Sequence, residues 1–340
     1  MTTQRLRVQK GIYRDENDRL IGNKETLLLK WSKYKLIEKK KETERISSFT
    51  FSAVERVETP IQIMPGAHIR VKLGPRSGNL VRAYSVVEGD SDTFTLGIAH
   101  DANSRGGSKF MHEQLKIGDE LMFSKMASDF PLRSNDGCDE HIFIAGGVGI
   151  TAFVASARSL KDQEIPFKLY YATKCGDDIA FKNILATLGN NVEFCVSENG
   201  TRMNIGKFLR QAKETAHVYV CGPDRLLNAV RDTAKAIGFP EHNISSEAFA
   251  VSTSGDPFTV EIESQDKKLQ VKEDESLLDI LRSAGFDVAS SCEVGNCGTC
   301  RIGVRNGRVE HRGTGLLEDE KKGMMLSCVS RGVGTLVLDL

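Results

Sequence analysis

Four of the eight cysteines are spaced so that they could act together as ligands of a metal centre. Cys292, Cys297 and Cys300 form the pattern C-x4-C-x2-C, and Cys328 follows 28 positions after Cys300. A structural zinc site usually pairs two short C-x2-C hooks from two chain segments. Here one loop supplies three thiols and a distant cysteine supplies the fourth, as in plant-type 2Fe-2S clusters. The spacing therefore favours a 2Fe-2S cluster over a zinc site.

A glycine-rich turn in the middle of the chain is typical of a phosphate-binding site. The apolar run 141–145 predicts a buried strand, and Gly146, Gly147 and Gly149 follow at once, before a helix predicted to end at residue 160. Glycines let the backbone approach a pyrophosphate, and a helix N-terminus supplies N–H donors. The same turn can also serve close packing alone, so the assignment depends on its context.

The context is a predicted parallel sheet. Further strands are predicted at 167–171, 192–196 and 218–221, and helices at 207–213 and 226–237. Ligands bind at the carboxyl edge of such a sheet, where the glycine turn and the segment Cys221-Gly222-Pro223 would meet. We therefore expect a Rossmann-like α/β domain that binds a dinucleotide through Gly146, Gly147, Gly149, Thr151, Cys221, Gly222 and Pro223.

Two short motifs in the first half of the chain suit a flat cofactor that carries a phosphate. In Arg82-Ala83-Tyr84-Ser85 the guanidinium can hold a phosphate, the phenol ring can lie on a flat ring system, and the hydroxyl can bind a ring nitrogen. Arg105-Gly106-Gly107-Ser108 offers backbone N–H groups to a second phosphate contact. Either motif alone could be a surface turn. Both lie among short strands predicted at 34–37, 46–51, 68–73, 84–87, 94–100 and 120–123, which favour an antiparallel β-barrel.

Residues 258–340 predict a small α+β domain around the cysteine loop. Strands at 258–263 and 268–272 form a hairpin, a short helix at 276–281 ends at Gly285, and a closing strand covers 335–340. This segment resembles a plant-type ferredoxin domain with a β-grasp fold over its whole length.

From residue 33 onward, the chain resembles the phthalate dioxygenase reductase and vanillate demethylase reductase group of the ferredoxin–NADP reductase superfamily. The motifs that carry the resemblance are RAYS, RGGS, AGGVGIT, CGP, SSEAF and CEVGNCGTC, in that order. The resemblance implies an FMN-binding β-barrel domain at 33–137, an NAD-binding α/β domain at 138–250, a linker at 251–257 and a 2Fe-2S ferredoxin domain at 258–340. Residues 1–32 lie outside it as an N-terminal extension, interpreted as an arm or an extra edge hairpin with one possible strand at 26–31.

The resemblance also implies a function. It predicts an NADH-dependent oxidoreductase that passes electrons singly, through FMN and the 2Fe-2S cluster, to a separate Rieske-type non-haem iron oxygenase. It places FMN against Arg82, Ala83, Tyr84, Ser85, Ile98, Ala99, His100, Gly106, Gly107, Ser108, Glu247 and Phe249. It places the nicotinamide near Thr151, Cys221, Gly222 and Pro223. Hydride transfer to a flavin needs proximity more than a catalytic proton, so we expect no acid–base residue and interpret His68, His112 and His217 as structural or solvated.

The residues leave some alternatives open. Ala152 stands where the family usually has proline, His100 where lysine is common, and Gly313 where the family has aspartate. Lys174 follows a predicted strand and could meet the 2′-phosphate of NADPH, and FAD is the alternative to FMN. The partner could instead be a haem monooxygenase or a ferredoxin-like acceptor, or the protein could be a stand-alone diaphorase. The non-enzyme alternative is a zinc-stabilised nucleotide sensor.

The composition fits a cytoplasmic protein of two or three domains. The chain has 340 residues, 46 basic against 46 acidic side chains and 40% hydrophobic residues, which argues against intrinsic disorder and against nucleic-acid coating. No run reaches the roughly 18 apolar residues of a membrane helix, and the N-terminus lacks the apolar core of a signal peptide. Residues 258–340 carry 11 basic against 14 acidic side chains, so we expect this domain to dock on a basic patch of its partner. We also expect a monomer and a flexible linker.

Overall fold

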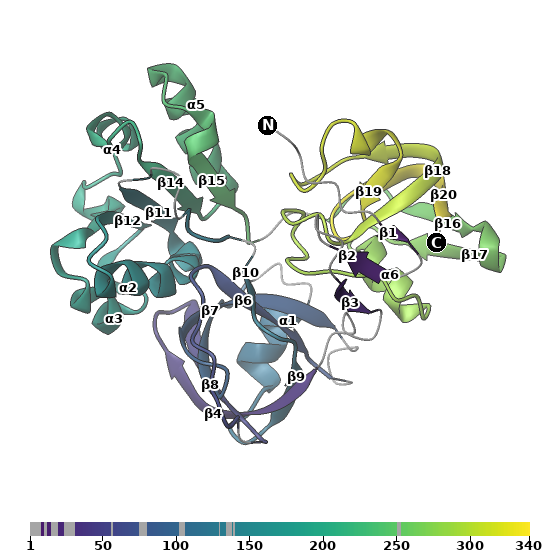
Figure 1. Ribbon diagram of the computed structural model, residues 1–340, viewed down its shortest axis with the longest axis horizontal. Coiled ribbons are helices and arrows are strands. Elements are labelled where there is room, and N and C mark those ends of the chain that lie inside the picture. Colours follow the sequence, from purple (N-terminus) through teal and green to yellow (C-terminus); the bar gives the residue numbers. More distant parts are fainter. Residues whose placement is uncertain are drawn as a thin grey trace.

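The computed structural model describes residues 8–9, 12–14, 20–23, 31–55, 57–74, 80–101, 106–128, 130–133, 138, 140–249 and 253–340. Its main part has three domains that follow one another along the sequence: a barrel domain (31–133), a parallel-sheet domain (138–249) and a C-terminal domain (253–340) (Figure 1). Ahead of them, the strands β1 (Val8–Gln9), β2 (Ile12–Arg14) and β3 (Leu20–Asn23) pair antiparallel in a small sheet of their own. The possible strand at 26–31 lies, except for Trp31, outside the described residues.

The barrel domain is a closed antiparallel barrel, as predicted. Its strands, in order around the ring, are β6 (Ala67–Lys72), β7 (Val81–Gly89), β8 (Thr93–Ala99), β5 (Ile46–Ala53), β4 (Ser32–Lys41) and β9 (Glu120–Phe123). Pairing of β6 with β9 closes the ring, and β10 (Ala127–Ser128) adds to β6. Aromatic rings fill the interior: Phe51 and Phe123 are fully buried and meet edge-on, with centroids 4.7 Å apart. Edge-on ring pairs stabilise a core by more than the burial of their surface area alone, so they add to the stability of the barrel.

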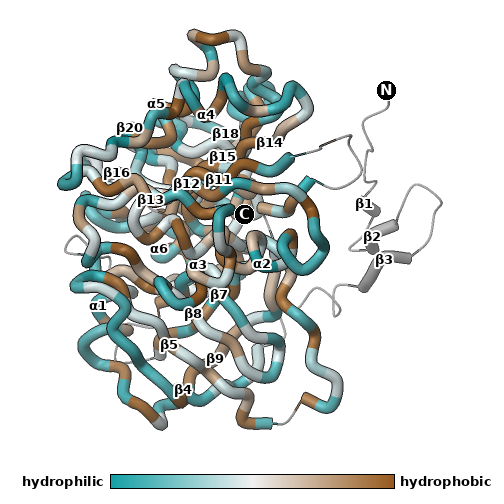
Figure 2. The backbone as a smooth tube through the Cα atoms, turned by 90° about the vertical axis from the view of Figure 1, so that its left-hand side faces the viewer, coloured by the Kyte–Doolittle hydropathy of each residue, from teal (hydrophilic) through white to brown (hydrophobic). Residues whose placement is uncertain are grey.

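The parallel-sheet domain has the predicted doubly wound architecture. Its strands, in sheet order, are β13 (Val192–Val196), β12 (Phe167–Thr173), β11 (His141–Gly146), β14 (His217–Cys221) and β15 (Ile244–Glu247), all parallel. The helices are α2 (Val154–Asp162), α3 (Lys182–Thr187), α4 (Ile205–Gln211) and α5 (Asp224–Ile237). Strands β11 and β14 are buried along their whole length, and Figure 2 shows their hydrophobic character.

Successive side chains of β11 point to opposite faces of the sheet, and both faces are covered by helices. Phe143 packs with α2 and α3 in one hydrophobic cluster, whereas Ile144 packs with α4 and α5 in another. A strand covered on both faces reads as a continuous apolar run, which is why the sequence predicts it well. The glycine turn differs from the prediction: residues 147–152 form a 3-10 helix, and α2 starts only at Val154.

The C-terminal domain is a mixed sheet with one helix across it, in agreement with the predicted β-grasp fold. The sheet order is β17 (Lys267–Val271), β16 (Phe258–Ile262), β20 (Arg331–Asp339), β18 (Arg301–Glu310) and β19 (Met324–Leu326). Helix α6 (Leu277–Ser283) packs its leucines on this sheet. The hydroxyl of Ser276 caps the helix by accepting a hydrogen bond from the Asp279 N–H at 3.1 Å, which satisfies one of its free donors.

The barrel and parallel-sheet domains share one hydrophobic core. Ile46 and Val87 of the barrel belong to the same buried cluster as Phe143 and Phe153. The C-terminal domain instead meets the barrel domain through polar contacts, which are described below. Among the helices that the structure describes, none combines the length and the apolar character needed to cross a bilayer.

Candidate functional site

The two short motifs of the barrel domain lie against each other. Arg82 and Tyr84 belong to β7, and Gly107 begins the short helix α1 (Gly107–Lys109). A Cβ atom on Gly107 would lie 2.7 Å from Arg82 Cγ, closer than real Cβ contacts allow, and 3.1 Å from Tyr84 Oη, which is tight. Gly107 therefore leaves bare backbone beside a guanidinium and a phenol. Such a cradle fits a cofactor that carries a phosphate and a flat ring.

The strand register shows which residues share a face with Ala83 and Ser85 of this motif. In the β6–β7 pair, His68 lies opposite Ser85 and Arg70 lies opposite Ala83. Opposite residues of an antiparallel pair point to the same face, so His68 and Arg70 share a face with Ser85. Ser85 and His68 are 9% and 7% exposed. This face is the one that the C-terminal domain covers.

The glycine turn and the segment after β14 meet at one edge of the parallel sheet. Strand β11 lies beside β14, where the order of connection reverses, and both segments follow the carboxyl ends of those strands. A Cβ atom on Gly149 would lie 2.2 Å from Cys221 O, and one on Gly146 would lie 3.1 Å from Pro223 Cδ. The turn thus packs directly on the second segment. This is the topological switch point at which parallel sheets bind dinucleotides.

Two residues predicted to face the nicotinamide have buried side chains. Thr151 is 1% exposed, and its hydroxyl donates to the carbonyl of Val148 at 2.9 Å. Cys221 is fully buried, and burial raises the pKa of its thiol well above the usual value. Its backbone, and not its sulfur, borders the glycine turn. Gly147, Gly222 and Pro223 keep exposed surface at this edge.

The barrel domain meets the parallel-sheet domain where β8 runs past the glycine turn. A Cβ atom on Gly97 would lie 2.4 Å from Thr151 Cγ2 and 2.7 Å from Phe181 Cζ. Only a glycine at this position allows the two domains to approach so closely. The flavin-type and dinucleotide-type motifs therefore lie on two sides of a fixed apolar junction.

The remaining predicted residues lie in the barrel domain and at the end of the parallel-sheet domain. Ile98 is buried in the barrel core, while Ala99 and Phe249 pack from the two sides on the shared core. His100 Nε2 lies 3.1 Å from Glu113 Oε1. Glu247 ends β15 and Ser108 accepts a hydrogen bond from the Asp101 N–H at 3.3 Å.

The four clustered cysteines form two pairs. The Sγ atoms of Cys300 and Cys328 lie 3.1 Å apart, and Cys292 Sγ accepts hydrogen bonds from the N–H groups of Asn296 and Cys297 at 3.3 and 3.4 Å. Cys297 is partly exposed and the other three are buried. Among the described residues, no three His, Cys, Asp or Glu side chains are gathered as ligands of a single ion. Two pairs of thiols fit a binuclear cluster, in which the four thiolates are divided between two irons.

Each pair contains one thiol that loses its proton easily. A hydrogen bond from Cys292 lowers the pKa of Cys297 to about 6, and a hydrogen bond from Cys328 lowers the pKa of Cys300. The pKa values of their partners Cys292 and Cys328 are raised. The thiolate is the form that binds a metal, so each pair has one thiol that is favoured as a ligand.

Close backbone approaches shape the loop around these cysteines. Gly295 and Gly298 have φ angles of +80° and +75°, a left-handed conformation that side chains other than glycine adopt at a cost. A Cβ atom on Gly298 would lie 2.5 Å from Gly315 O. In the segment after Gly315, Leu316 packs against Cys300 and Cys328. Its neighbour Leu317 is 73% exposed. A hydrophobic side chain thus stands on the surface next to the cysteine loop.

The cysteine loop is also tied to the other two domains. Asn296 Nδ2 donates to the carbonyl of Ala248 at 3.3 Å, one residue before Phe249. Arg82 Nη1 lies 3.7 Å from Asp279 Oδ1 of α6. Asn296 lies within the predicted CEVGNCGTC motif, but the sequence does not indicate its contact with another domain. Sequence reasoning missed Asp279, whose only signal is its position after the helix cap Ser276. The C-terminal domain therefore contacts the end of the parallel-sheet domain and the RAYS motif of the barrel domain.

The described part of the linker is fixed on the C-terminal domain. Arg331 is 2% exposed, and its guanidinium donates to the carbonyls of Thr253, Asp256, Lys272 and Glu275. Arg312 donates to the carbonyl of Ser254 at 2.8 Å. The small polar residues of the linker predict flexibility. Residues 253–256 are instead held in place, because two guanidinium groups donate hydrogen bonds to their carbonyl oxygens.

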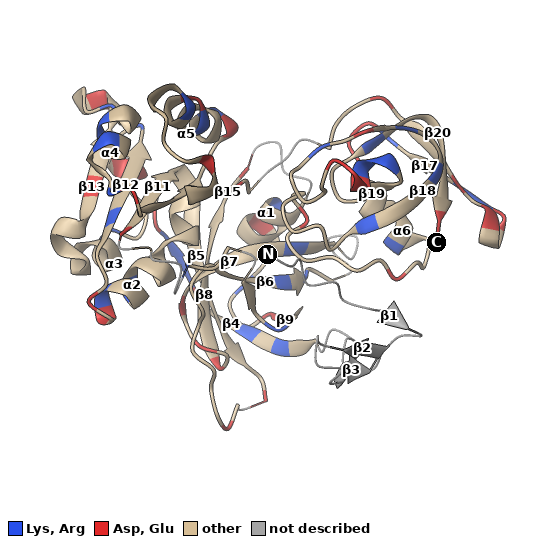
Figure 3. Ribbon diagram, turned by 45° about the horizontal axis from the view of Figure 1, so that its top comes forward, with Lys and Arg blue, Asp and Glu red and all other residues tan. Residues whose placement is uncertain are grey.

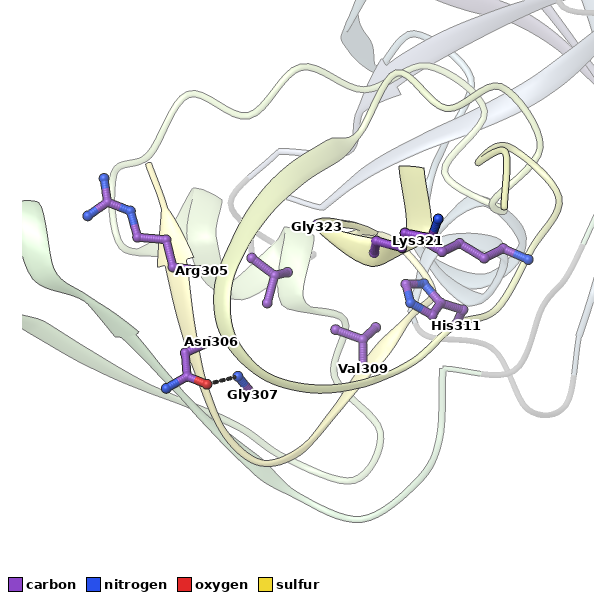
Figure 4. Close-up of a pocket in the computed structure, with 9 residues that line it drawn as sticks. Arg305, Asn306, Gly307, Val309, His311, Lys321 and Gly323 are labelled. Atoms are coloured by element: carbon purple, nitrogen blue, oxygen red, sulfur yellow. Dashed lines mark hydrogen bonds between the residues drawn. The ribbon is translucent and has the colours of Figure 1, made fainter. Parts of the chain in front are cut away.

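A cavity of about 190 Å³ lies elsewhere on the C-terminal domain, beside β18 (Figure 4). Arg305, His311 and Lys321 are among its lining residues. Its cations are already paired, Arg305 with Asp339 at 2.6 Å and Lys321 with Glu318 at 2.5 Å. The lining shares no residue with the RAYS motif, the glycine turn or the cysteine loop. We therefore assign the cavity no part in the site.

Comparisons with known proteins agree with this arrangement. Residues 260–332 match the family model of the 2Fe-2S iron-sulfur cluster binding domain, and residues 130–244 match that of the dimethylamine monooxygenase subunit DmmA-like, N-terminal domain. The chain is 36% identical over 279 residues to the heme-dependent oxidative N-demethylase beta subunit of Ectopseudomonas mendocina, with 81% of this chain and 88% of that one covered. It is 36% identical over 289 residues to a vanillate O-demethylase oxidoreductase of a Pseudomonas strain, with 81% and 89% covered.

One solved structure resembles the whole three-domain arrangement. The structure of phthalate dioxygenase reductase matches with a TM-score of 0.76 at 28% identity, and covers 91% of this chain and 98% of that one. The chain belongs to the vanillate demethylase reductase and phthalate dioxygenase reductase family. The predicted fold, the ferredoxin domain and the oxidoreductase class are confirmed. The chain spans 57% of the length of another relative, a protein of Gibberella moniliformis named "Reductase", at 32% identity.

Proposed function

We propose that this protein is the reductase of a multicomponent oxygenase and acts in the cytoplasm. It takes hydride from NADH onto FMN and delivers electrons one at a time, through a 2Fe-2S cluster, to a separate oxygenase. The observation that carries the proposal is that the C-terminal domain contacts both other domains, with Asn296 on Ala248 and Asp279 beside Arg82. When bound, FMN accepts two electrons together and passes them on singly, which a hydride donor and a one-electron cluster require between them.

The barrel domain would hold the flavin. Arg82 and the backbone at Gly106 and Gly107 would bind its phosphate, Tyr84 would lie along its ring, and Ser85 would offer its hydroxyl to a ring nitrogen. The bare backbone at Gly107 supports this assignment, because any larger residue would fill the cradle. The preference for FMN over FAD rests on the resemblance of the RAYS and RGGS motifs to phthalate dioxygenase reductase.

The parallel-sheet domain would hold NADH in the crevice between the glycine turn and the segment after β14. Gly147, Gly222 and Pro223 are accessible there and would touch the dinucleotide. Thr151 would act through the turn, since its hydroxyl holds Val148 O. Hydride transfer would need proximity of the two cofactors more than an acid or a base, and the close contact of the two domains at Gly97 supports such proximity.

The C-terminal domain would hold the cluster on Cys292, Cys297, Cys300 and Cys328. Backbone N–H groups that point at the sulfur of Cys292 stabilise negative charge on it, and such donors tune the potential of an iron–sulfur centre. The partly exposed Cys297 and the exposed Leu317 mark the side from which electrons would leave.

The partner that we propose is a Rieske-type non-haem iron oxygenase, as the resemblance to the vanillate and phthalate reductases suggests. A second candidate is a haem-dependent demethylase. It is favoured by the 36% identity to a subunit of a heme-dependent oxidative N-demethylase and by the match of residues 130–244 to a dimethylamine monooxygenase subunit.

Spectroscopy of the anaerobic protein tests the proposal. We expect flavin and iron–sulfur absorption bands that bleach on addition of NADH, and FMN as the flavin released on denaturation. Turnover with a Rieske oxygenase and with a haem demethylase then distinguishes the two partners. A preparation that stays colourless after incubation with FMN, iron and sulfide would overturn the proposal and favour the zinc-stabilised sensor.

A further inference from the structure

A buried polar network joins the barrel domain to the cysteine loop. Arg70 of β6 is 5% exposed, and its Nη1 donates to the carbonyl oxygen of Ser290 and, at 3.0 Å, to the hydroxyl of the same residue. Beside it, His68 Nε2 lies 3.0 Å from Ser291 Oγ. Two side chains of one strand thus hold the two residues that lead into Cys292. Figure 3 shows β6 and α6 with their basic positions where the two domains face each other.

The C-terminal domain completes the network from its own side. Glu293 is 6% exposed, and its Oε1 accepts hydrogen bonds from Arg282 Nη2 at 2.8 Å and from Ser290 Oγ at 2.9 Å. Arg282 Nη2 also donates to the hydroxyl of Ser290. Asp279 lies between Arg282, at 3.9 Å, and Arg82 of the RAYS motif, at 3.7 Å. Charged groups of alternating sign therefore run from the proposed flavin site to the cluster loop.

Ser290 is the centre of this network. Its hydroxyl accepts two hydrogen bonds, from Arg70 and Arg282, and donates one to Glu293, which is its full capacity. Arg282 Nη1 is buried without a hydrogen-bond partner among the described residues, so only the Ser290 hydroxyl has all its partners. Loss of Arg70 or Arg282 would therefore leave a buried polar group of this network unpaired. The contact therefore defines a single docked position of the cysteine loop.

The two interfaces of the barrel domain differ in character. Its junction with the parallel-sheet domain is an apolar core that includes Ile46, Val87 and Phe143. Its contact with the cysteine loop is polar and depends on a few hydrogen bonds. Domains joined by a small polar contact can separate, whereas a shared hydrophobic core keeps two domains together. Weakening the polar contact should therefore move the cluster and leave the dinucleotide site in place.

We propose that Arg70 is the positioning residue for electron transfer from the flavin to the cluster. It fixes Ser290, and through it Cys292, on the strand that neighbours the RAYS motif, where Arg70 lies opposite Ala83. The inference rests on the function proposed above. The rate of electron transfer falls steeply with distance, so a loosened loop slows this step. Hydride transfer takes place across the apolar junction and keeps its rate.

Arg70→Met tests the proposal, because it keeps an unbranched side chain and removes every donor. Hydrogen bonds from a charged donor are strong enough that their loss lowers the docking equilibrium constant about tenfold or more, and the docked fraction by up to the same factor. Stopped-flow absorption of the anaerobic holoprotein mixed with NADH should show flavin reduction at the parent rate and cluster reduction slowed about tenfold. Arg70→Lys keeps one cationic donor and should recover part of the rate. Arg305→Met, at a surface ion pair of the C-terminal domain, is the matched control and should change neither phase.

Ser290→Ala weakens the same contact on the side of the C-terminal domain. It is the second test of the proposal if Arg70→Met does not fold. It keeps the carbonyl acceptor and should slow cluster reduction less, with the visible circular dichroism of the cluster unchanged. Cluster reduction at the parent rate in the folded variants, or an equal slowing of flavin reduction, would overturn the role of Arg70. A parent protein in which NADH reduces the flavin but never the cluster would instead overturn the proposed function.

Discussion

Replacing Gly149 by alanine should push the glycine turn away from the segment after β14. The added Cβ atom would lie 2.2 Å from Cys221 O, 2.5 Å from Cys221 C and 2.9 Å from Gly222 N. Unbonded carbon and oxygen atoms approach to about 3.3 Å, so the two segments must separate by roughly 1 Å. The opposing atoms are backbone at the end of a buried strand, so rotation of a side chain cannot relieve the clash. Overpacking of this kind costs about 1–3 kcal/mol.

The separation should disturb the proposed NADH site in particular. A misplacement of reacting groups by about 1 Å can slow a reaction about a hundredfold. We expect kcat/KM for NADH, with ferricyanide as electron acceptor, to fall about ten- to hundredfold. Flavin reduced chemically should still pass electrons to the cluster at the parent rate. Gly176→Ala in the same domain is the control, because no described atom lies within 4 Å of a Cβ there. If Gly149→Ala matched this control in Tm and in kcat/KM, the close approach at Gly149 would not shape the crevice.

Three further predictions concern the cluster, the pH dependence and the partner. Cys328→Ser removes one sulfur of the pair with Cys300, so iron analysis should show loss of the cluster while flavin and ferricyanide activity remain; a full iron content would contradict its role as ligand. Burial lowers the pKa of His141 and of His112, so the folded state favours their neutral forms. The preference of the folded state for neutral histidines stabilises the protein fully above the unfolded pKa of about 6.5. This contribution to the free energy of unfolding is lost as the pH falls below that value. Tm should therefore drop between about pH 7.5 and about pH 5.5, and His141→Gln should reduce the drop; an equal drop in the variant would exclude His141 as its source. Leu317→Ser removes an exposed side chain beside the cysteine loop, so it should slow electron delivery to the oxygenase severalfold at unchanged ferricyanide activity; normal delivery would place the docking surface elsewhere.

The motifs could be predicted from the sequence because each of them consists of neighbouring residues. The cysteine spacing, the glycine turn and the RAYS motif carry their geometry within a few positions. Strands with an apolar run or a clear alternation, such as β11 and β16, lie within two residues of their predicted bounds. The domain order follows from the order of these elements.

The features that could not be predicted depend on residues far apart in the chain. Arg70 and Ser290 are separated by 220 positions, and nothing near either of them indicates the other. Strand β15 has the sequence ISSE, which lacks an apolar run because its residues are only partly buried. The inward orientation of Cys221 and the capture of the linker by Arg331 are set by tertiary packing. Local patterns therefore identify the site, whereas its assembly needs the folded chain.

The fixed linker limits how far the C-terminal domain can travel. Phe249 packs on the parallel-sheet domain and Thr253 is held by Arg331, so four Cα–Cα steps of about 3.8 Å, or roughly 15 Å, join the two domains. A cluster on so short a tether faces the flavin at an effective concentration of roughly millimolar or more. A docking contact too weak to join two separate proteins is then strong enough. In the proposed function, the domain would swing toward an oxygenase, deliver its electron and return to the barrel domain without a diffusional search.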